Sequence, residues 1–156
     1  MTAGRRRRAH RDRGESGQIS LLVLGWAVVV VLLVVGTVAV TSVELSRMRL
    51  LDAADAAALD AADSLDTGAY RRGLGGAVAL SDDSVREGAQ AYLGSLSRAP
   101  GILAWWVAAG TGSPDGQTAV VRLTGEADVP LVGGVLRALG GSVTITVESH
   151  ARAPLE

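Results

Sequence analysis

The chain has 156 residues, which leaves room for one small domain beside any membrane segment. Cysteine is absent, so disulfides, thiolate metal sites and thiol nucleophiles are excluded. The formal net charge of −1 hides an asymmetry, because residues 1–16 carry six arginines against two acids and residues 44–156 carry nine arginines against fourteen acids. The two ends of the chain therefore suit different environments.

An uncharged segment of 27 residues extends from Gly17 to Val43. About 20 helical residues span the roughly 30 Å hydrocarbon core of a bilayer, so residues 17–43 predict one transmembrane helix. A cleavable signal peptide is the alternative interpretation. Its apolar region would be only about 7–15 residues long, so we expect this helix to be a permanent anchor.

Arginines close to a spanning segment are retained on the cytoplasmic side of the membrane. The expected topology determinants are Arg5, Arg6, Arg7, Arg8, Arg11 and Arg13. Residues 1–16 are therefore predicted to be a basic cytoplasmic tail at the inner (cell) membrane, with the C-terminal part outside the cell membrane. A nucleic-acid patch is the alternative, but the arginines lack interleaved aromatics and adjoin a membrane helix, so we expect no nucleic-acid partner.

Residues 44–66 contain strong helix formers and no Pro or Gly, so the helix is expected to continue outside the membrane and to end at Thr67–Gly68. At 100° per residue, one face carries five aspartates: Asp52, Asp55, Asp60, Asp63 and Asp66. We interpret them as a solvated face, since a regular helix lacks the backbone oxygens and turn glycine of a calcium loop. The opposite face is the small-residue stripe, made of Leu50, Ala54, Ala57, Ala58, Ala61 and Leu65. This stripe is a candidate for helix packing within its own domain or with a neighbour.

Residues 67–156 predict a small extracytoplasmic head. A second helix is expected to begin after Ser81 as N-cap and to bury an apolar stripe. The stripe residues are Val85, Ala89, Tyr92, Leu93 and Leu96. Alternating segments predict strands over 102–109, 117–129 and 142–148, with Thr144, Thr146 and Glu148 facing solvent and a short apolar helix over 131–139. The predicted fold class is α+β, with a long N-terminal helix, a second helix and an antiparallel sheet of about three strands.

No set of catalytic or metal-binding residues is recognisable in the sequence. His10 and His150 would be separated by the membrane, and Gly73–Gly76 lacks the residues of a phosphate-binding loop. We therefore expect no enzyme activity, cofactor, metal or small-molecule substrate. Trp105 and Trp106 are the one aromatic concentration; in a strand they point to opposite faces, so one is expected in the core and the other is a candidate partner or membrane surface.

The order of these features is similar to that of a known family. An arginine-rich tail leads through Arg13-Gly14-Glu15-Ser16-Gly17-Gln18 into the apolar segment, and the polar-alanine helix Leu51 to Leu59 follows. Val129-Pro130-Leu131, a short apolar helix and a final strand over 142–153 complete the pattern. Together they resemble the TadE/TadG-like proteins of the Flp (tight adherence) pilus assembly system. The resemblance implies a role in pilus assembly, contacts with other pilin-like subunits through the N-terminal helix, and no catalysis.

Processing of the N-terminus is the point at which the chain departs from the pilin pattern. Prepilin processing uses a Gly before the cut and a Glu five residues after it, whereas the fifth residue after Gly17 is Leu22 and the fifth after Gly14 is Ile19. We therefore expect an uncleaved chain, with Gly17 as the site to test. The alternative function is a membrane-tethered envelope binding or sensor module that uses Trp105 or Trp106 for recognition.

Overall fold

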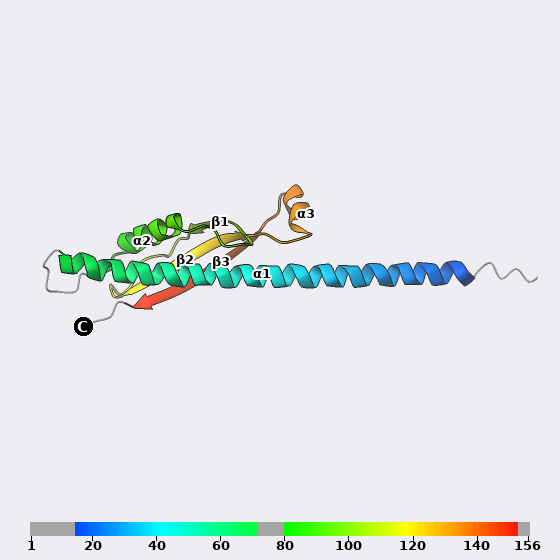
Figure 1. Cartoon of the computed structure of the whole chain (residues 1–156), viewed down its shortest axis with the longest axis horizontal. Helices are drawn as coiled ribbons and strands as arrows, with labels where there is room; N and C mark the ends of the chain where they lie inside the picture. Colours follow the sequence, from blue (N-terminus) through cyan, green and yellow to red (C-terminus); the bar gives the residue numbers. More distant parts are fainter. Residues whose placement is uncertain (1–14, 72–79, 153–156) are drawn as a thin grey trace, which may run out of the picture. The chain divides into compact units, whose positions relative to one another are not determined.

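The computed structural model describes residues 15–71 and 80–152. Its elements, in chain order, are α1 (Glu15–Arg71), α2 (Asp82–Ser95), β1 (Ile102–Val107), β2 (Thr118–Ala127), α3 (Gly133–Ala138) and β3 (Val143–Arg152) (Figure 1). The predicted α+β class is confirmed. The chain divides into two compact units, Met1–Thr37 and Val38–Glu156, and α1 contributes residues to both.

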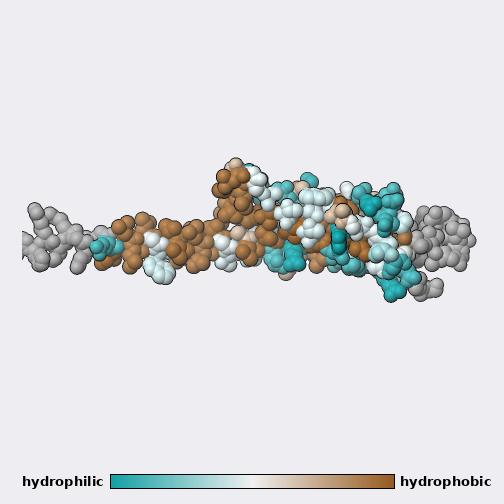
Figure 2. All heavy atoms as spheres, turned by 180° about the vertical axis from the view of Figure 1, so that it is seen from behind, coloured by the Kyte–Doolittle hydropathy of each residue, from teal (hydrophilic) through white to brown (hydrophobic). Residues whose placement is uncertain are grey.

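The first unit is the apolar part of α1. Its large side chains from Ile19 to Val34 are mostly exposed, and this helix is the one in the described residues that is long and apolar enough to cross a membrane. The Thr37 hydroxyl donates to the Leu33 carbonyl at 2.8 Å, which satisfies a polar group within an apolar stretch. Figure 2 shows the resulting run of hydrophobic surface. Such a surface is unfavourable in water and suits lipid.

In the second unit α1 runs to Arg71, so its predicted end at Thr67–Gly68 was too early. One glycine in a helix interior costs only about 1 kcal/mol relative to alanine. Because the long alanine-rich segment before it favours the helix, Gly68 does not interrupt it. The predicted Gly-rich loop at 73–76 falls outside the described residues.

The sheet is antiparallel, with strand order β1-β2-β3. Its central strand pairs Thr124 with Trp106 on one side and with Thr146 on the other. β3 continues to Arg152, four residues beyond the end predicted from the alternation and within the 142–153 range of the resemblance, because Ser149 and Ala151 extend the alternation of buried and exposed positions. Thr144, Thr146 and Glu148 are exposed, as predicted.

The core of the second unit lies between α1, α2 and one face of the sheet. Leu50 of α1, Val85 of α2 and Leu123 of β2 are among its completely buried side chains. Gly125 lets α1 approach β2 closely, since a Cβ at this position would stand 3.1 Å from both δ-carbons of Leu50. The sheet is thus covered by helix on one face, and its Thr124–Thr146 face carries the polar side chains.

The start of α2 follows the sequence prediction. Ser81 is its N-cap and forms a capping box with Ser84, in which each side chain accepts a hydrogen bond from the other residue's backbone N–H. Val85, Ala89 and Leu93 are buried, whereas Leu96 is exposed because the helix ends at Ser95. This single apolar stripe is what fixes α2 on the core.

Candidate interaction surfaces

The small-residue stripe of α1 is enclosed by the second unit itself. Leu50, Ala54, Ala57, Ala58 and Ala61 are at most 1% exposed. At the α1–α2 contact a Cβ on Gly88 would stand 3.5 Å from the Cα and Cβ of Ala61, which is ordinary van der Waals distance. The Leu65 side chain lies outside the described part. In this fold the stripe is packed internally between Leu50 and Ala61, so that stretch is not a free surface.

The acidic face of α1 is the solvent-exposed side of the same helix. Asp52, Asp55, Asp60 and Asp63 are all exposed. The described residues hold no group of three or more His, Cys, Asp or Glu side chains that could bind a metal ion. The Asp66 side chain lies beyond the described part of this face.

The two tryptophans point to opposite faces of β1. Trp105 pairs with Gly125 and packs against the core, whereas Trp106 pairs with Thr124 on the polar face and is 48% exposed. Between β1 and α2 lies an open groove of about 300 Å³. Gln90, Leu93 and Gly94 line it from α2, and Trp105, Trp106 and Val107 line it from β1. The groove offers apolar contact area with an amide beside it.

The polar face of the sheet carries an ionic cluster that the sequence reading did not identify. The Arg122 guanidinium donates to the Glu148 carboxylate, and His150 Nε2 lies 2.9 Å from Glu148 Oε1. Arg122, more than His150, holds the pKa of Glu148 below its ordinary value. All three side chains are exposed, so their attractions are screened by water. The register of β2 against β3, which brings Arg122 opposite Glu148, was the missing information.

A second polar feature is the turn before β2. Asp115 Oδ1 accepts hydrogen bonds from the backbone N–H groups of Gln117 and Thr118, and Asp115 Oδ2 accepts one from the Thr118 hydroxyl. These bonds, with that to Gln117 first, lower the pKa of Asp115 from 3.8 to about 2. Their role is structural, because they set the turn from which β2 starts.

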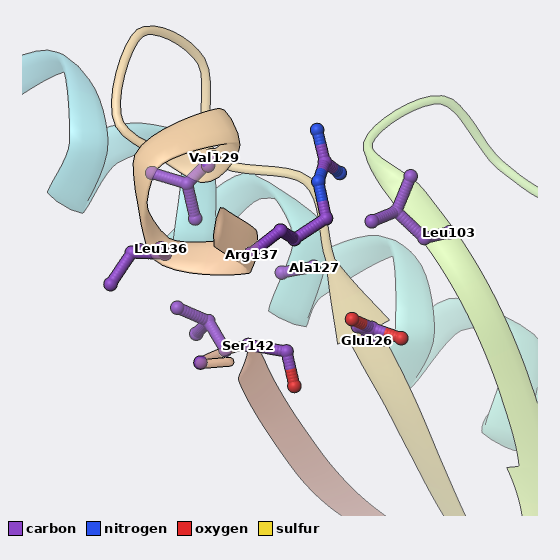
Figure 3. Close-up of a pocket in the computed structure, with 10 residues that line it drawn as sticks. Leu103, Glu126, Ala127, Val129, Leu136, Arg137 and Ser142 are labelled. Atoms are coloured by element: carbon purple, nitrogen blue, oxygen red, sulfur yellow. The ribbon is translucent and has the colours of Figure 1, made fainter. Parts of the chain in front are cut away.

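The cavity at the α3 end of the sheet is too small for a substrate. Its volume is about 10 Å³, roughly the space of one water molecule. Figure 3 shows Arg137 and Glu126 at this cavity together with Leu103, Val129 and Leu136. Arg137 lies 3.6 Å from Asp128, so this cation is paired at the edge of the cavity.

The predicted topology arginines, Arg5 to Arg13, lie outside the described residues. Gly17, the candidate processing site, lies in the first turn of α1. The predicted division into residues 1–16, 17–43, 44–66 and 67–156 remains a prediction. The boundary between the two compact units, at Thr37 and Val38, reflects contacts within the chain and does not mark a membrane surface.

Comparison with known proteins bears on the N-terminal part of the chain. No curated protein and no solved structure gives a significant match. Residues 17–64 match the model of the family described as putative Flp pilus-assembly TadE/G-like, in agreement with the resemblance seen in the sequence. These residues contain the apolar part of α1 and most of the small-residue stripe. The match supports involvement of this chain in Flp pilus assembly and interaction with other pilus components.

Proposed function

We propose that this chain is a pilin-like, single-pass component of Flp or type IV-like pilus assembly without catalytic activity. Residues 17–43 anchor it in the cell (inner) membrane, the basic tail 1–16 lies in the cytoplasm, and residues 67–156 form the extracytoplasmic head. The observation that carries this proposal is the family match over residues 17–64, because it covers the helix that is apolar enough to span a bilayer.

The surfaces of the chain support a binding role without chemistry. The apolar part of α1 is exposed and suits lipid and the helices of other pilin-like subunits. The titratable side chains on the open sheet face are solvent-exposed and paired with one another, unlike the desolvated groups of most active sites. The proposed partners are therefore the bilayer and other pilus subunits, with neither nucleic acid nor a small-molecule substrate.

Membrane topology is tested with single cysteines, which this cysteine-free chain permits without background. Thr2→Cys reports on the tail and Gly94→Cys on an exposed position of α2. In spheroplasts, a membrane-impermeant maleimide should label Gly94→Cys at once and Thr2→Cys only after lysis. Immediate labelling of Thr2→Cys alone would reverse the proposed orientation, and a chain found in the soluble fraction would refute anchoring.

Participation in pilus assembly is tested genetically. Deletion of the gene should abolish surface pili, and the full chain should restore them. A chain whose residues 17–43 are replaced by a leucine segment of equal length keeps the anchor and loses the specific helix surface, so it separates anchoring from subunit contact. Restoration by this variant would contradict contacts through the N-terminal helix, and unchanged piliation in the deletion strain would contradict the function.

Processing of the N-terminus has its own test. We propose that the chain stays uncleaved at Gly17, because Leu22 stands where prepilin processing uses glutamate. Sequencing the N-terminus of the membrane-extracted protein should find no chain that begins at Gln18. A chain beginning at Gln18 would show that a prepilin peptidase cuts here.

The second candidate function is a membrane-tethered binding or sensor module of the envelope, and the groove beside Trp106 favours it. The chain would then bind its ligand with Trp106. Under this function the deletion strain keeps its pili, and Trp106→Ala should reproduce the envelope defect that the deletion causes. Near-ultraviolet circular dichroism would establish that the head of this variant is still folded. If Trp106→Ala is silent in a strain with normal pili, the sensor function is excluded.

A further inference from the structure

Three large apolar side chains are left exposed around α3. Leu131, Val135 and Leu139 are 71%, 62% and 81% exposed and follow one another at intervals of four residues, and we call them the α3 patch. Figure 2 shows this segment as a hydrophobic projection from the second unit. Leu131 also has a φ of 70°, a strained conformation for a leucine. Exposure of three large apolar side chains to water is unfavourable.

The α3 patch lies at the end of the second unit where α1 leaves the uncharged segment. The Gly101 carbonyl accepts hydrogen bonds from Ser46 Oγ and from the backbone N–H of Asp128, both at 2.9 Å. Asp128 follows the last residue of β2 and precedes α3. Ser46 in turn is three residues past Val43, about 5 Å of helix rise. These hydrogen bonds hold the segment that leads into α3 beside Ser46, close to the predicted end of the transmembrane helix at Val43.

The contacts that β2 and α2 make with α1 show at which end of the second unit α3 lies. Gly125 of β2 lies against Leu50 of α1, whereas Asp128, three residues later, is linked through the Gly101 carbonyl to Ser46. β2 therefore runs toward the N-terminal part of α1 as it approaches α3. The α2 contact at Gly88 lies beside Ala61, further along α1 from that part. The exposed apolar side chains around α3 therefore lie at the end of the second unit that is nearer the N-terminal part of α1.

We propose that the α3 patch inserts into the headgroup region of the outer leaflet and holds the head against the bilayer surface. Apolar side chains on a short helix with a charged neighbour suit this interface. Arg137 is half exposed and lies 3.6 Å from Asp128, and its long side chain can keep the guanidinium in water while the leucines enter lipid. The inference rests on the proposed membrane anchoring.

The test measures lipid contact by spin labels in the full chain. Single cysteines at Leu139 and Leu131 report on the patch, Glu87→Cys on exposed α2 serves as the aqueous control, and Val30→Cys reports on the spanning segment. The protein is reconstituted in phosphatidylcholine–phosphatidylglycerol vesicles, and collision rates with oxygen and with a water-soluble nickel chelate are compared. Oxygen should exceed the chelate at Leu139, Leu131 and Val30, and the order should be reversed at Glu87. Adding Val135→Glu should shift the Leu139 label toward the Glu87 value.

The possible outcomes separate this inference from the proposed function. If the Val30 label is in lipid but the patch labels behave like Glu87, anchoring stands and lipid contact of α3 is refuted. If the Val30 label is itself in water, anchoring and the inference fail together. Spin–spin broadening at Leu139 that disappears on dilution with unlabelled chain would show that a second copy covers the patch, which also overturns lipid contact.

Discussion

The close approach of α1 to β2 at Gly125 makes a quantitative prediction about stability. A Cβ there would stand 3.1 Å from both δ-carbons of Leu50, whereas carbon atoms pack at about 3.5–4.0 Å. The overlap is about 0.4–0.9 Å at two contacts, and Leu50 is only 1% exposed, so it has little room to move. Gly125→Val adds two further methyl groups and should lower the free energy of unfolding by about 1–3 kcal/mol.

A double-mutant cycle with Leu50 tests the origin of that cost. Leu50→Ala alone should destabilise by about 2–5 kcal/mol because it leaves a cavity in the core. In the double variant the valine fills part of that cavity, so its cost should be smaller than the sum of the two single costs by about 0.5–3 kcal/mol. Gly94→Val is the control, since nothing lies within 4 Å of its added Cβ, and its effect should stay below about 1 kcal/mol.

The assay is urea unfolding of the full chain in detergent, followed by tryptophan fluorescence. A Trp26→Phe background leaves Trp105 and Trp106 as the reporters, and both belong to β1 of the second unit. Strictly additive costs of Leu50→Ala and Gly125→Val would refute the reasoning, because the clash would then not involve Leu50. A neutral Gly125→Val would refute it as well.

Three further predictions concern the loops and strands of the head. Gly112→Ala should lower the unfolding free energy by about 1–3 kcal/mol in the same urea assay, because its Cβ would collide with the Asp82 carboxylate that accepts the Ser113 N–H at 2.7 Å. The Asp115 pKa is lowered on folding, so its stabilising effect is complete above about pH 4 and is lost as pH falls toward 2; thermal unfolding between pH 5 and 2 should show a smaller acid loss in Asp115→Ala than in the parent chain. Arg122→Ala should cost less than about 1 kcal/mol by urea unfolding, since its ion pair with Glu148 is exposed, and a larger loss would show that the pair is better shielded than its exposure indicates.

Local signals in the sequence predicted those elements whose causes are local. Ser81 is followed by two acids and then by apolar residues at helical spacing, and the structure places the N-cap there. The clean alternation after Ser142 likewise predicted β3, although its end was placed too early at Glu148. Each of these features depends on residues within a few positions in the sequence, so the local pattern is sufficient to predict it.

Features that depend on tertiary register could not be obtained in this way. Gly125 occurs in an alternating strand pattern, and nothing around it in sequence indicates that Leu50 will pack against it. The grouping of Arg122, Glu148 and His150 requires the pairing of β2 with β3, which shifts by a whole side-chain set when the register moves by one residue. Composition gives no information on either choice.

Substitutions on the small-residue stripe and on the acidic face of α1 separate two explanations of a pilus defect. Ala58 is completely buried, so Ala58→Leu should overpack the core of the second unit, lower its unfolding free energy by about 1–3 kcal/mol and reduce piliation through loss of folded protein. Asp60 lies on the exposed acidic face, so Asp60→Leu should change stability by no more than about 0.5 kcal/mol. Unfolding measurements and pilus counts on both variants then locate the partner surface. If Asp60→Leu abolishes pili while the head stays stable, a partner contacts the acidic face. If Ala58→Leu abolishes pili with unchanged stability, the small-residue stripe is an intersubunit surface in the cell and not an internal contact.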